Sequence, residues 1–178
     1  MEKNKEEFIK SQIFSLTIMG GLSRGYPVYE KAVLETDKNN FKKFLEETLK
    51  SYGKLYEKEV EENEHIKNIL KLKKVATEKF GKIFKDKKFR LGRAQKVLNL
   101  YLKYLWTLGR IPKPPHCPFD SVIISKLGKE VKNITWTKLD KEEDYKRLVE
   151  VARKISHDNI ASWELEYWNN NLEKQNIL

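Results

Sequence analysis

Residues 90–108 read RLGRAQKVLNLYLKYLWTL, and their pattern gives the first indication of the architecture. Apolar residues recur every three or four positions from Leu91 to Leu105, which predicts a helix with a wide apolar face. The same spacing returns on both sides of this stretch. It predicts further helices from Phe8 to Gly20-Gly21, Phe41 to Leu49, Ile66 to Phe80, Asp140 to Ile155 and Ile160 to Tyr167.

Shorter elements connect these helices. We expect a short helix after Pro27 that breaks at residues 37–40, an exposed one over residues 55–60 and an apolar one over residues 120–127. The proline-rich RIPKPPHCP (110–118) cannot be helical. The prediction is a compact all-α single domain over residues 1–178, with about eight helices. Its parts are N-terminal helices (1–80), a basic helix with the proline loop (81–127) and C-terminal helices (128–178).

Composition narrows the class of protein. With 39% apolar and 35% charged residues, the chain is typical of soluble helical proteins. No apolar run approaches the roughly 20 residues that span a bilayer, and the charged start MEKNKEEF is not a signal peptide. We therefore expect a cytoplasmic protein without a membrane partner. Cys117 is the single cysteine and there are three histidines, so no metal and no cofactor is expected. The sequence does not indicate an oligomeric state.

The positive charge is concentrated between Lys79 and Lys113. This window holds eleven Lys or Arg and one acid, Asp86, and its net charge of +10 equals that of the whole chain. Aromatic residues are interleaved with the cations. A local cationic, aromatic segment is typical of a surface that binds a phosphate backbone, which predicts a nucleic-acid partner, with DNA favoured over RNA.

One face of the helix over residues 90–108 is polar. Lys96, Asn99, Lys103, Trp106 and Arg110 follow at intervals of three and four, with Gln95 beside them. We expect this face to follow a nucleic-acid strand, with phosphate close to the backbone amides at Gly92. The alternative is a solvated lysine-rich face with Trp106 folded into the core. The predicted DNA contacts are Lys88, Arg90, Gly92, Arg93, Gln95, Lys96, Asn99, Arg110, Lys113 and His116.

The second motif is PPHCPFDSVII (114–124), which places Asp120 at the start of an apolar helix. Asp is a favoured N-cap, and this is the simpler interpretation. However, a glycine-led basic helix, a proline-rich loop and a Pro-x-Asp turn follow one another here. This order resembles that of the helix-hairpin-helix DNA glycosylase superfamily. The resemblance covers residues 88–127 and depends on Gly92, Pro118 and Asp120.

The resemblance implies cleavage of the N-glycosidic bond of a flipped base, modified or damaged. Asp120 would be the catalytic carboxylate that stabilises the sugar cation or activates water. Bifunctional members use a lysine, for which Lys96 and Lys103 are the candidates, but a monofunctional hydrolase is favoured over a lyase. The flipped base would lie among the aromatic side chains of Trp106, Trp136 and Tyr145.

Other interpretations stay open at this stage. The chain is alternatively a non-enzymatic nucleic-acid-binding protein of a mobile element or an antiviral defence locus, with Asp120 only a cap. A third class is a protein-interaction module that grips an acidic partner. The loop GGLSRG (20–25) would hold phosphate with its amides and Arg24, or form part of a pocket. His65 is predicted to be exposed on a charged helix.

Overall fold

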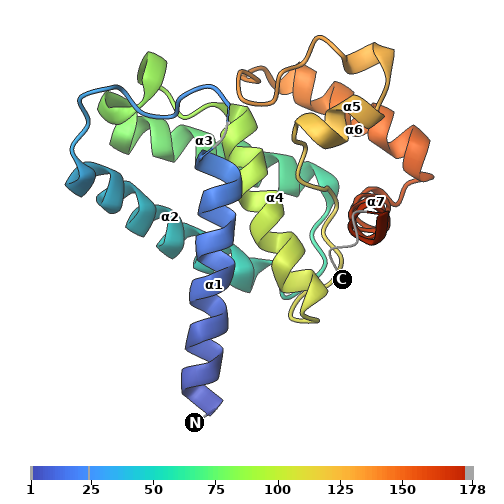
Figure 1. The fold of residues 1–178 in the computed structure, drawn as a ribbon, viewed down its shortest axis with the longest axis horizontal. Coiled ribbons are helices and arrows are strands. Elements are labelled where there is room, and N and C mark those ends of the chain that lie inside the picture. Colours follow the sequence, from blue (N-terminus) through green and yellow to red (C-terminus); the bar gives the residue numbers. More distant parts are fainter. Residues whose placement is uncertain (1, 24, 175–178) are drawn as a thin grey trace.

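The long helix predicted from residues 90–108 lies at the centre of the molecule. In the computed structural model, which describes residues 2–23 and 25–174, this helix is α4 (Leu91–Thr107), and twelve of its seventeen residues are buried. Helices α1 (Glu2–Leu22) and α2 (Glu35–Leu55) lie on one side of α4, and α3 (Glu62–Phe80) crosses behind it. Helices α5 (Ser121–Lys126), α6 (Glu142–Ser156) and α7 (Ile160–Lys174) lie on the other (Figure 1).

The all-α prediction is confirmed. The described residues form seven α-helices, one fewer than the expected eight or so, and three single turns of 3-10 helix. These turns are η1 (Gly81–Ile83), η2 (Lys85–Lys87) and η3 (Lys129–Val131). Within the described part of the chain, no helix combines the length and the hydropathy that crossing a membrane requires.

Two glycines that were expected to end the first helix instead lie inside it. Helix α1 continues to Leu22, and Gly20 and Gly21 face α4. A Cβ at Gly21 would lie 2.4 Å from the Val97 side chain, and one at Gly20 would lie 2.6 Å from Leu100. The glycines therefore allow two helices to pack closely, a long-range role that their local sequence does not reveal.

The predicted short helices around α2 were wrong. Residues 37–40 do not break a helix, because they belong to the first turns of α2. Glu35 and Asp37 lie in its first turn, where negative charge is favourable. Residues 55–60 form no exposed helix, since α2 ends at Leu55 and Tyr56 turns into the core.

The segment from Ile111 to Phe119 crosses the polar face of α4 as irregular chain, and most of it is buried. Helix α5 follows it, as predicted, with Asp120 as N-cap. Asp140 was expected to begin a helix, but α6 begins at Glu142. Asp140 instead accepts a hydrogen bond from the Leu91 amide (3.3 Å) and pairs with Lys73 and Lys88 at 2.8 Å each.

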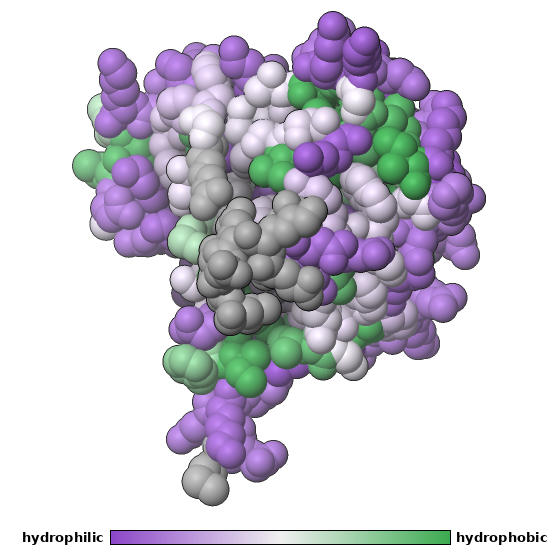
Figure 2. Space-filling model, turned by 45° about the vertical axis from the view of Figure 1, so that its right-hand side comes forward, coloured by the Kyte–Doolittle hydropathy of each residue, from purple (hydrophilic) through white to green (hydrophobic). Residues whose placement is uncertain are grey.

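The N-terminal half of α1 extends beyond the rest of the molecule (Figure 1). Its tip is hydrophilic, and apolar side chains gather above the tip, where the helix meets the body (Figure 2). Phe8 is 63% exposed, and Leu16 and Met19 are also exposed on this helix. Leu16 and Met19 lie at the edge of the cavity described next.

Candidate active site

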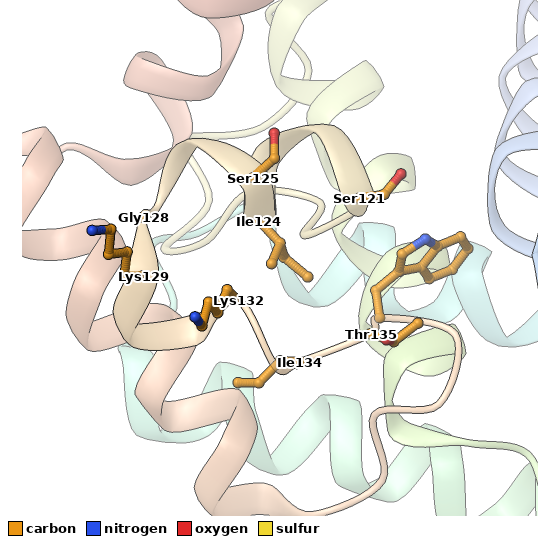
Figure 3. Close-up of a pocket in the computed structure, with 9 residues that line it drawn as sticks. Ser121, Ile124, Ser125, Gly128, Lys129, Lys132, Ile134 and Thr135 are labelled. Atoms are coloured by element: carbon orange, nitrogen blue, oxygen red, sulfur yellow. The ribbon is translucent and has the colours of Figure 1, made fainter.

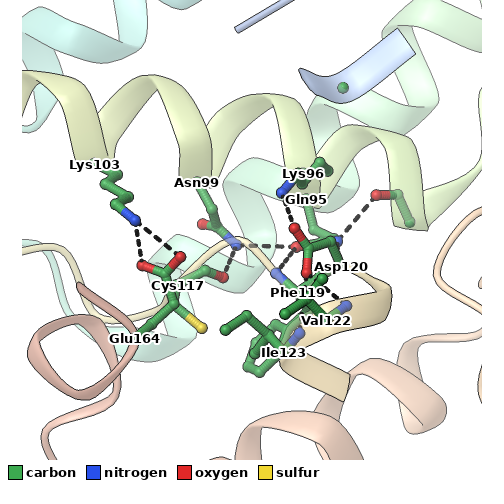
Figure 4. A network of polar contacts seen from close by, with 12 residues as sticks. Gln95, Lys96, Asn99, Lys103, Cys117, Phe119, Asp120, Val122, Ile123 and Glu164 are labelled. Atoms are coloured by element: carbon green, nitrogen blue, oxygen red, sulfur yellow. Dashed lines mark hydrogen bonds and ion pairs between the residues drawn. The ribbon is translucent and has the colours of Figure 1, made fainter. Parts of the chain in front are cut away.

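Asp120 and Lys96 meet on the wall of a cavity of about 450 Å³. The cavity lies between α1, α4, the start of α5 and the loop at residues 135–137. The Lys96 Nζ donates to Asp120 Oδ2 at 2.7 Å (Figure 4). The Lys96 side chain is 9% exposed and that of Asp120 is 15% exposed, so the pair is shielded but reached from the cavity.

The two oxygens of Asp120 have different partners. Oδ1 accepts the backbone N–H groups of Val122 and Ile123 at 3.0 Å each, which makes Asp120 the N-cap of α5. Oδ2 takes the ammonium of Lys96. Three donors therefore hold the carboxylate in one orientation.

Aromatic and aliphatic side chains line the rest of the cavity. Tyr104 and Leu100 come from α4, Trp168 comes from α7, and Trp136 comes from the loop after η3. Trp136 is the one predicted base-pocket residue that lines this cavity. The volume of the cavity lies within the roughly 300–1,000 Å³ of small-molecule sites. Its lining of apolar side chains with a few polar groups is also typical of such sites.

Gln95 and Asn99 do not face solvent, so their prediction as DNA contacts was wrong. Both are fully buried against the proline-rich segment. The Gln95 amide donates to the Phe119 carbonyl at 2.7 Å and accepts from the Phe119 N–H at 3.2 Å. Asn99 Nδ2 donates to the Cys117 carbonyl at 2.9 Å (Figure 4). These amides hold the segment that ends at Asp120.

His116 and Tyr145 are also buried. The predictions that His116 contacts DNA and that Tyr145 lies against a flipped base were therefore wrong. His116 Nδ1 lies 2.8 Å from the Tyr145 hydroxyl, and its Nε2 lies 3.4 Å from Glu62. His65, expected to be exposed, packs edge-on against His116 and lies 2.6 Å from the Tyr56 hydroxyl through Nδ1. Burial lowers the pKa of both histidines, which favours their neutral forms. The neighbouring His116 and Arg153 side chains lower the pKa of Glu62 to about 2.

Gly92 was expected to let phosphate reach the amides of α4, but the chain itself occupies this place. A Cβ at Gly92 would lie 1.6 Å from the Trp136 carbonyl oxygen. The Gly92 N–H donates to Leu139 O at 2.9 Å, and the Leu91 N–H donates to Asp140. The amides at the start of α4 therefore already have partners, and the prediction was wrong.

Arg93 was also predicted to contact DNA, and this was wrong because the side chain is buried. Its guanidinium donates to the carbonyl of Gly21 at 2.8 Å and to that of Tyr26. It lies over the Trp136 ring, 4.6 Å from the centroid. Arg93 therefore fixes the indole that forms one wall of the cavity. Arg24, proposed to hold phosphate, lies outside the described residues.

Lys103, predicted as a catalytic candidate beside Asp120, has Glu164 as its partner instead. It pairs with Glu164 at 2.8 Å, and Glu164 is 2% exposed. Burial raises the pKa of Glu164. Among the described residues, neither Lys103 nor Trp106 lines the cavity, and Trp106 is half-buried at the far end of α4. Of the two lysine candidates, the structure brings Lys96 alone to Asp120.

The basic window is partly neutralised within the protein. In the part of the chain that the structure describes, six of its eleven cations pair with carboxylates. Of the predicted DNA contacts, Lys88 pairs with Asp140, Arg90 with Asp86 and Arg110 with Glu6. Lys113 donates to the Asn159 side chain at 2.8 Å. These four are at least partly accessible, but the field expected from the charge count is reduced.

The sequence analysis missed several cavity residues. Tyr104 lies on the polar side of α4, among the lysines, but was not selected as a site residue. Trp168 comes from α7 and lies 48 residues after Asp120 in the sequence. No group of three or more His, Cys, Asp or Glu suited to hold a metal ion occurs in the described residues. Comparison with protein-family models, with curated proteins and with solved structures found no match.

Proposed function

We propose that this chain is a cytoplasmic DNA glycosylase that cleaves the N-glycosidic bond of a flipped nucleotide, with Asp120 as the catalytic carboxylate. One observation carries the proposal: the Asp120–Lys96 pair lies on the wall of a cavity of about 450 Å³ that is lined by aromatic side chains. The order of helix, proline-rich loop and Asp120, which resembles the glycosylase superfamily, supports the same reaction.

Each group has a defined part in this reaction. The base leaves C1′ with the bonding electron pair, and the sugar acquires positive charge. The Asp120 carboxylate stabilises this charge because its orientation is fixed before the substrate arrives. A water adds its hydroxyl to C1′, and its proton passes by way of the carboxylate to the departing base, which leaves as the neutral free base. The Lys96 ammonium lies 2.7 Å from Asp120 Oδ2 and orients the carboxylate, and Trp136 and Tyr104 line the cavity that takes the extruded base.

A second function is favoured by a specific observation. Both oxygens of Asp120 already have partners, as helix cap and as ion pair, and these partners alone account for an aspartate at this position. The chain would then be a nucleic-acid-binding protein without catalysis. The two functions differ in a single measurable property, which is base release that depends on the charge of Asp120.

Asp120→Asn is the variant that separates them. Asn is as good an N-cap as Asp, so the variant keeps the cap of α5 and loses the negative charge. Wild type and variant are incubated with single- and double-stranded oligonucleotides that carry uracil, hypoxanthine, oxidised or alkylated purines or normal bases. Release is read as strand cleavage at abasic sites after alkali. We expect release by the wild type and a loss of at least 100-fold in the variant, with equal oligonucleotide affinity.

Asp37→Asn, on α2 and outside the cavity, is the matched control and retains full activity. Absence of base release by the wild type from every substrate, with oligonucleotide binding intact, would leave the binding function alone. Borohydride reduction during the reaction tests the lyase variant of the proposal. A trapped complex that disappears in Lys96→Gln would assign the lysine a covalent role.

A further inference from the structure

A second cavity, of about 480 Å³, lies beside the first. Ile124 and Ile134 form its apolar floor, and Ser125, Gly128, Lys129 and Lys132 complete its lining with three residues that also line the cavity of Asp120. These shared residues are Ser121, Thr135 and Trp136. A polymer that occupied both cavities would therefore pass over Trp136 and the start of α5.

Lys129 and Lys132 line this second cavity, and two further lysines lie near them in the sequence. Residues 126–138 hold four lysines, Lys126, Lys129, Lys132 and Lys138, against one acid, Glu130. All four lysines are exposed. Among the residues that the structure describes, none of the four pairs with a carboxylate, in contrast to six of the eleven cations of the 79–113 window. Within the described chain, exposed lysines without a carboxylate partner therefore cluster at the end of α5 and after it, whereas the cations of α4 itself are buried or paired.

The lining combines the groups that a nucleic-acid strand needs. In Figure 3, Ile124 reaches from α5 toward the loop that carries Ile134 and Thr135, and Lys129 and Lys132 gather at one end. The lysines suit phosphate, and the hydroxyls of Ser121, Ser125 and Thr135 donate to phosphate or sugar oxygens. Trp136 and the two isoleucines offer apolar contact to a base. Cations next to an aromatic platform are typical of single-strand binding.

We propose that this cavity binds the nucleotide that neighbours the one held at Asp120, with its phosphates on Lys129 and Lys132. The inference rests on the proposed function, since it assigns a path to the strand whose base enters the first cavity. It also assigns phosphate contacts to residues outside the basic window.

The test is the salt dependence of oligonucleotide binding. Affinity of a fluorescein-labelled oligothymidylate is measured by anisotropy between 50 and 200 mM NaCl for wild type and for the double variant Lys129→Gln/Lys132→Gln. Each lost phosphate contact on a single strand reduces the slope of log affinity against log salt by about 0.7. We expect a slope shallower by about 1.4 in the double variant. The control Lys43→Gln/Lys71→Gln removes two exposed lysines from α2 and α3 and keeps the wild-type slope.

A double variant that binds with the wild-type slope overturns the inference. The inference is also overturned if the wild type does not bind the oligonucleotide but binds polyglutamate through these lysines, because the partner would then be an acidic protein. The proposed function is judged by the base release of Asp120→Asn. Base release that depends on Asp120, with an unchanged slope in the double variant, defeats this inference alone. A reduced slope without any base release retains the binding cavity and defeats the catalytic proposal.

Discussion

Gly92→Ala tests what the start of α4 is built to hold. If Gly92 served to admit phosphate, Ala would stabilise the helix by about 1 kcal/mol and weaken oligonucleotide binding. The structure predicts the opposite sign for stability. The added Cβ would lie 1.6 Å from the Trp136 carbonyl oxygen, whereas a carbon–oxygen contact needs about 3.3 Å, so the loop must retreat by about 1.7 Å.

That retreat breaks the hydrogen bonds from Gly92 to Leu139 (2.9 Å) and from Leu91 to Asp140 (3.3 Å). A buried amide left without a partner costs about 2 kcal/mol. After the gain in helix propensity, we expect the free energy of unfolding to fall by about 3 kcal/mol. Because the same loop carries Trp136, base release should fall as well.

Urea unfolding of wild type and Gly92→Ala measures the change. Gly53→Ala, in α2, is the matched control, because the nearest neighbour of its added Cβ is the end of the Leu105 side chain at 3.2 Å. We expect that control to change stability by less than about 1 kcal/mol. A Gly92→Ala variant as stable as wild type, with weakened binding, would refute the structural role assigned to Gly92.

Three further perturbations probe the buried polar groups. Burial lowers the pKa of His65 and His116 in the folded protein, whereas both take up protons near pH 6.5 when unfolded, so the free energy of unfolding should fall between pH 7.5 and 5.5, by at most about 1.4 kcal/mol per histidine. Urea titrations at both pH values check this, and an equal pH dependence in His116→Gln would contradict it. Lys103→Met leaves Glu164 buried without its partner and should lose about 3–5 kcal/mol, and adding Glu164→Leu should recover most of this loss in thermal unfolding. Gln95→Leu removes both bonds to Phe119, and hydrogen exchange should then accelerate at Val122 and Ile123 but not in α3. Unchanged exchange in α5 would show that Gln95 does not anchor the segment.

Local patterns predicted much of the fold. The helix expected over residues 90–108 is α4 (Leu91–Thr107), because apolar spacing and helix-forming residues agree throughout it. Asp120 is the N-cap of a short helix as expected, since capping depends on residues two and three positions away. Both predictions depend on neighbours in sequence, and both were confirmed.

The interpretation of the polar face of α4 was wrong for a physical reason. Periodicity shows which residues share a face, but not what covers it. Here the proline-rich segment covers it, and the carbonyls of Cys117 and Phe119 take donors from Asn99 and Gln95. The roles of three glycines were also missed. Gly20, Gly21 and Gly92 are required because residues distant in sequence pack against them. The available signal was the presence of two side-chain amides, Gln95 and Asn99, among the lysines, because such groups can bind the backbone of a segment that covers the helix.

The charge count along the chain overestimated the unpaired positive charge for a related reason. A window counts charges along the chain, whereas binding depends on charges that remain unpaired in space. The cations of residues 79–113 pair with acids from four places in the fold. These are α1, the turn η2, the loop that precedes α6, and helix α7. The excess of four lysines over one acid in residues 126–138 is smaller, but no carboxylate in the described part of the chain pairs with these lysines. The smaller excess therefore lies where an anionic strand has access.

The structural role of Asp120 does not exclude a catalytic one. A carboxylate that stabilises developing positive charge is most effective when its orientation is fixed and little reorganisation is needed. The two amides of α5 and the ammonium of Lys96 supply that fixed orientation. Oδ1 is committed to the cap, while Oδ2 retains a lone pair beside its one ammonium contact. In Asp120→Asn the cap persists, but the charge is removed and the buried Lys96 loses its partner, so a loss of base release would report the charge of the Asp120–Lys96 pair rather than the cap of α5.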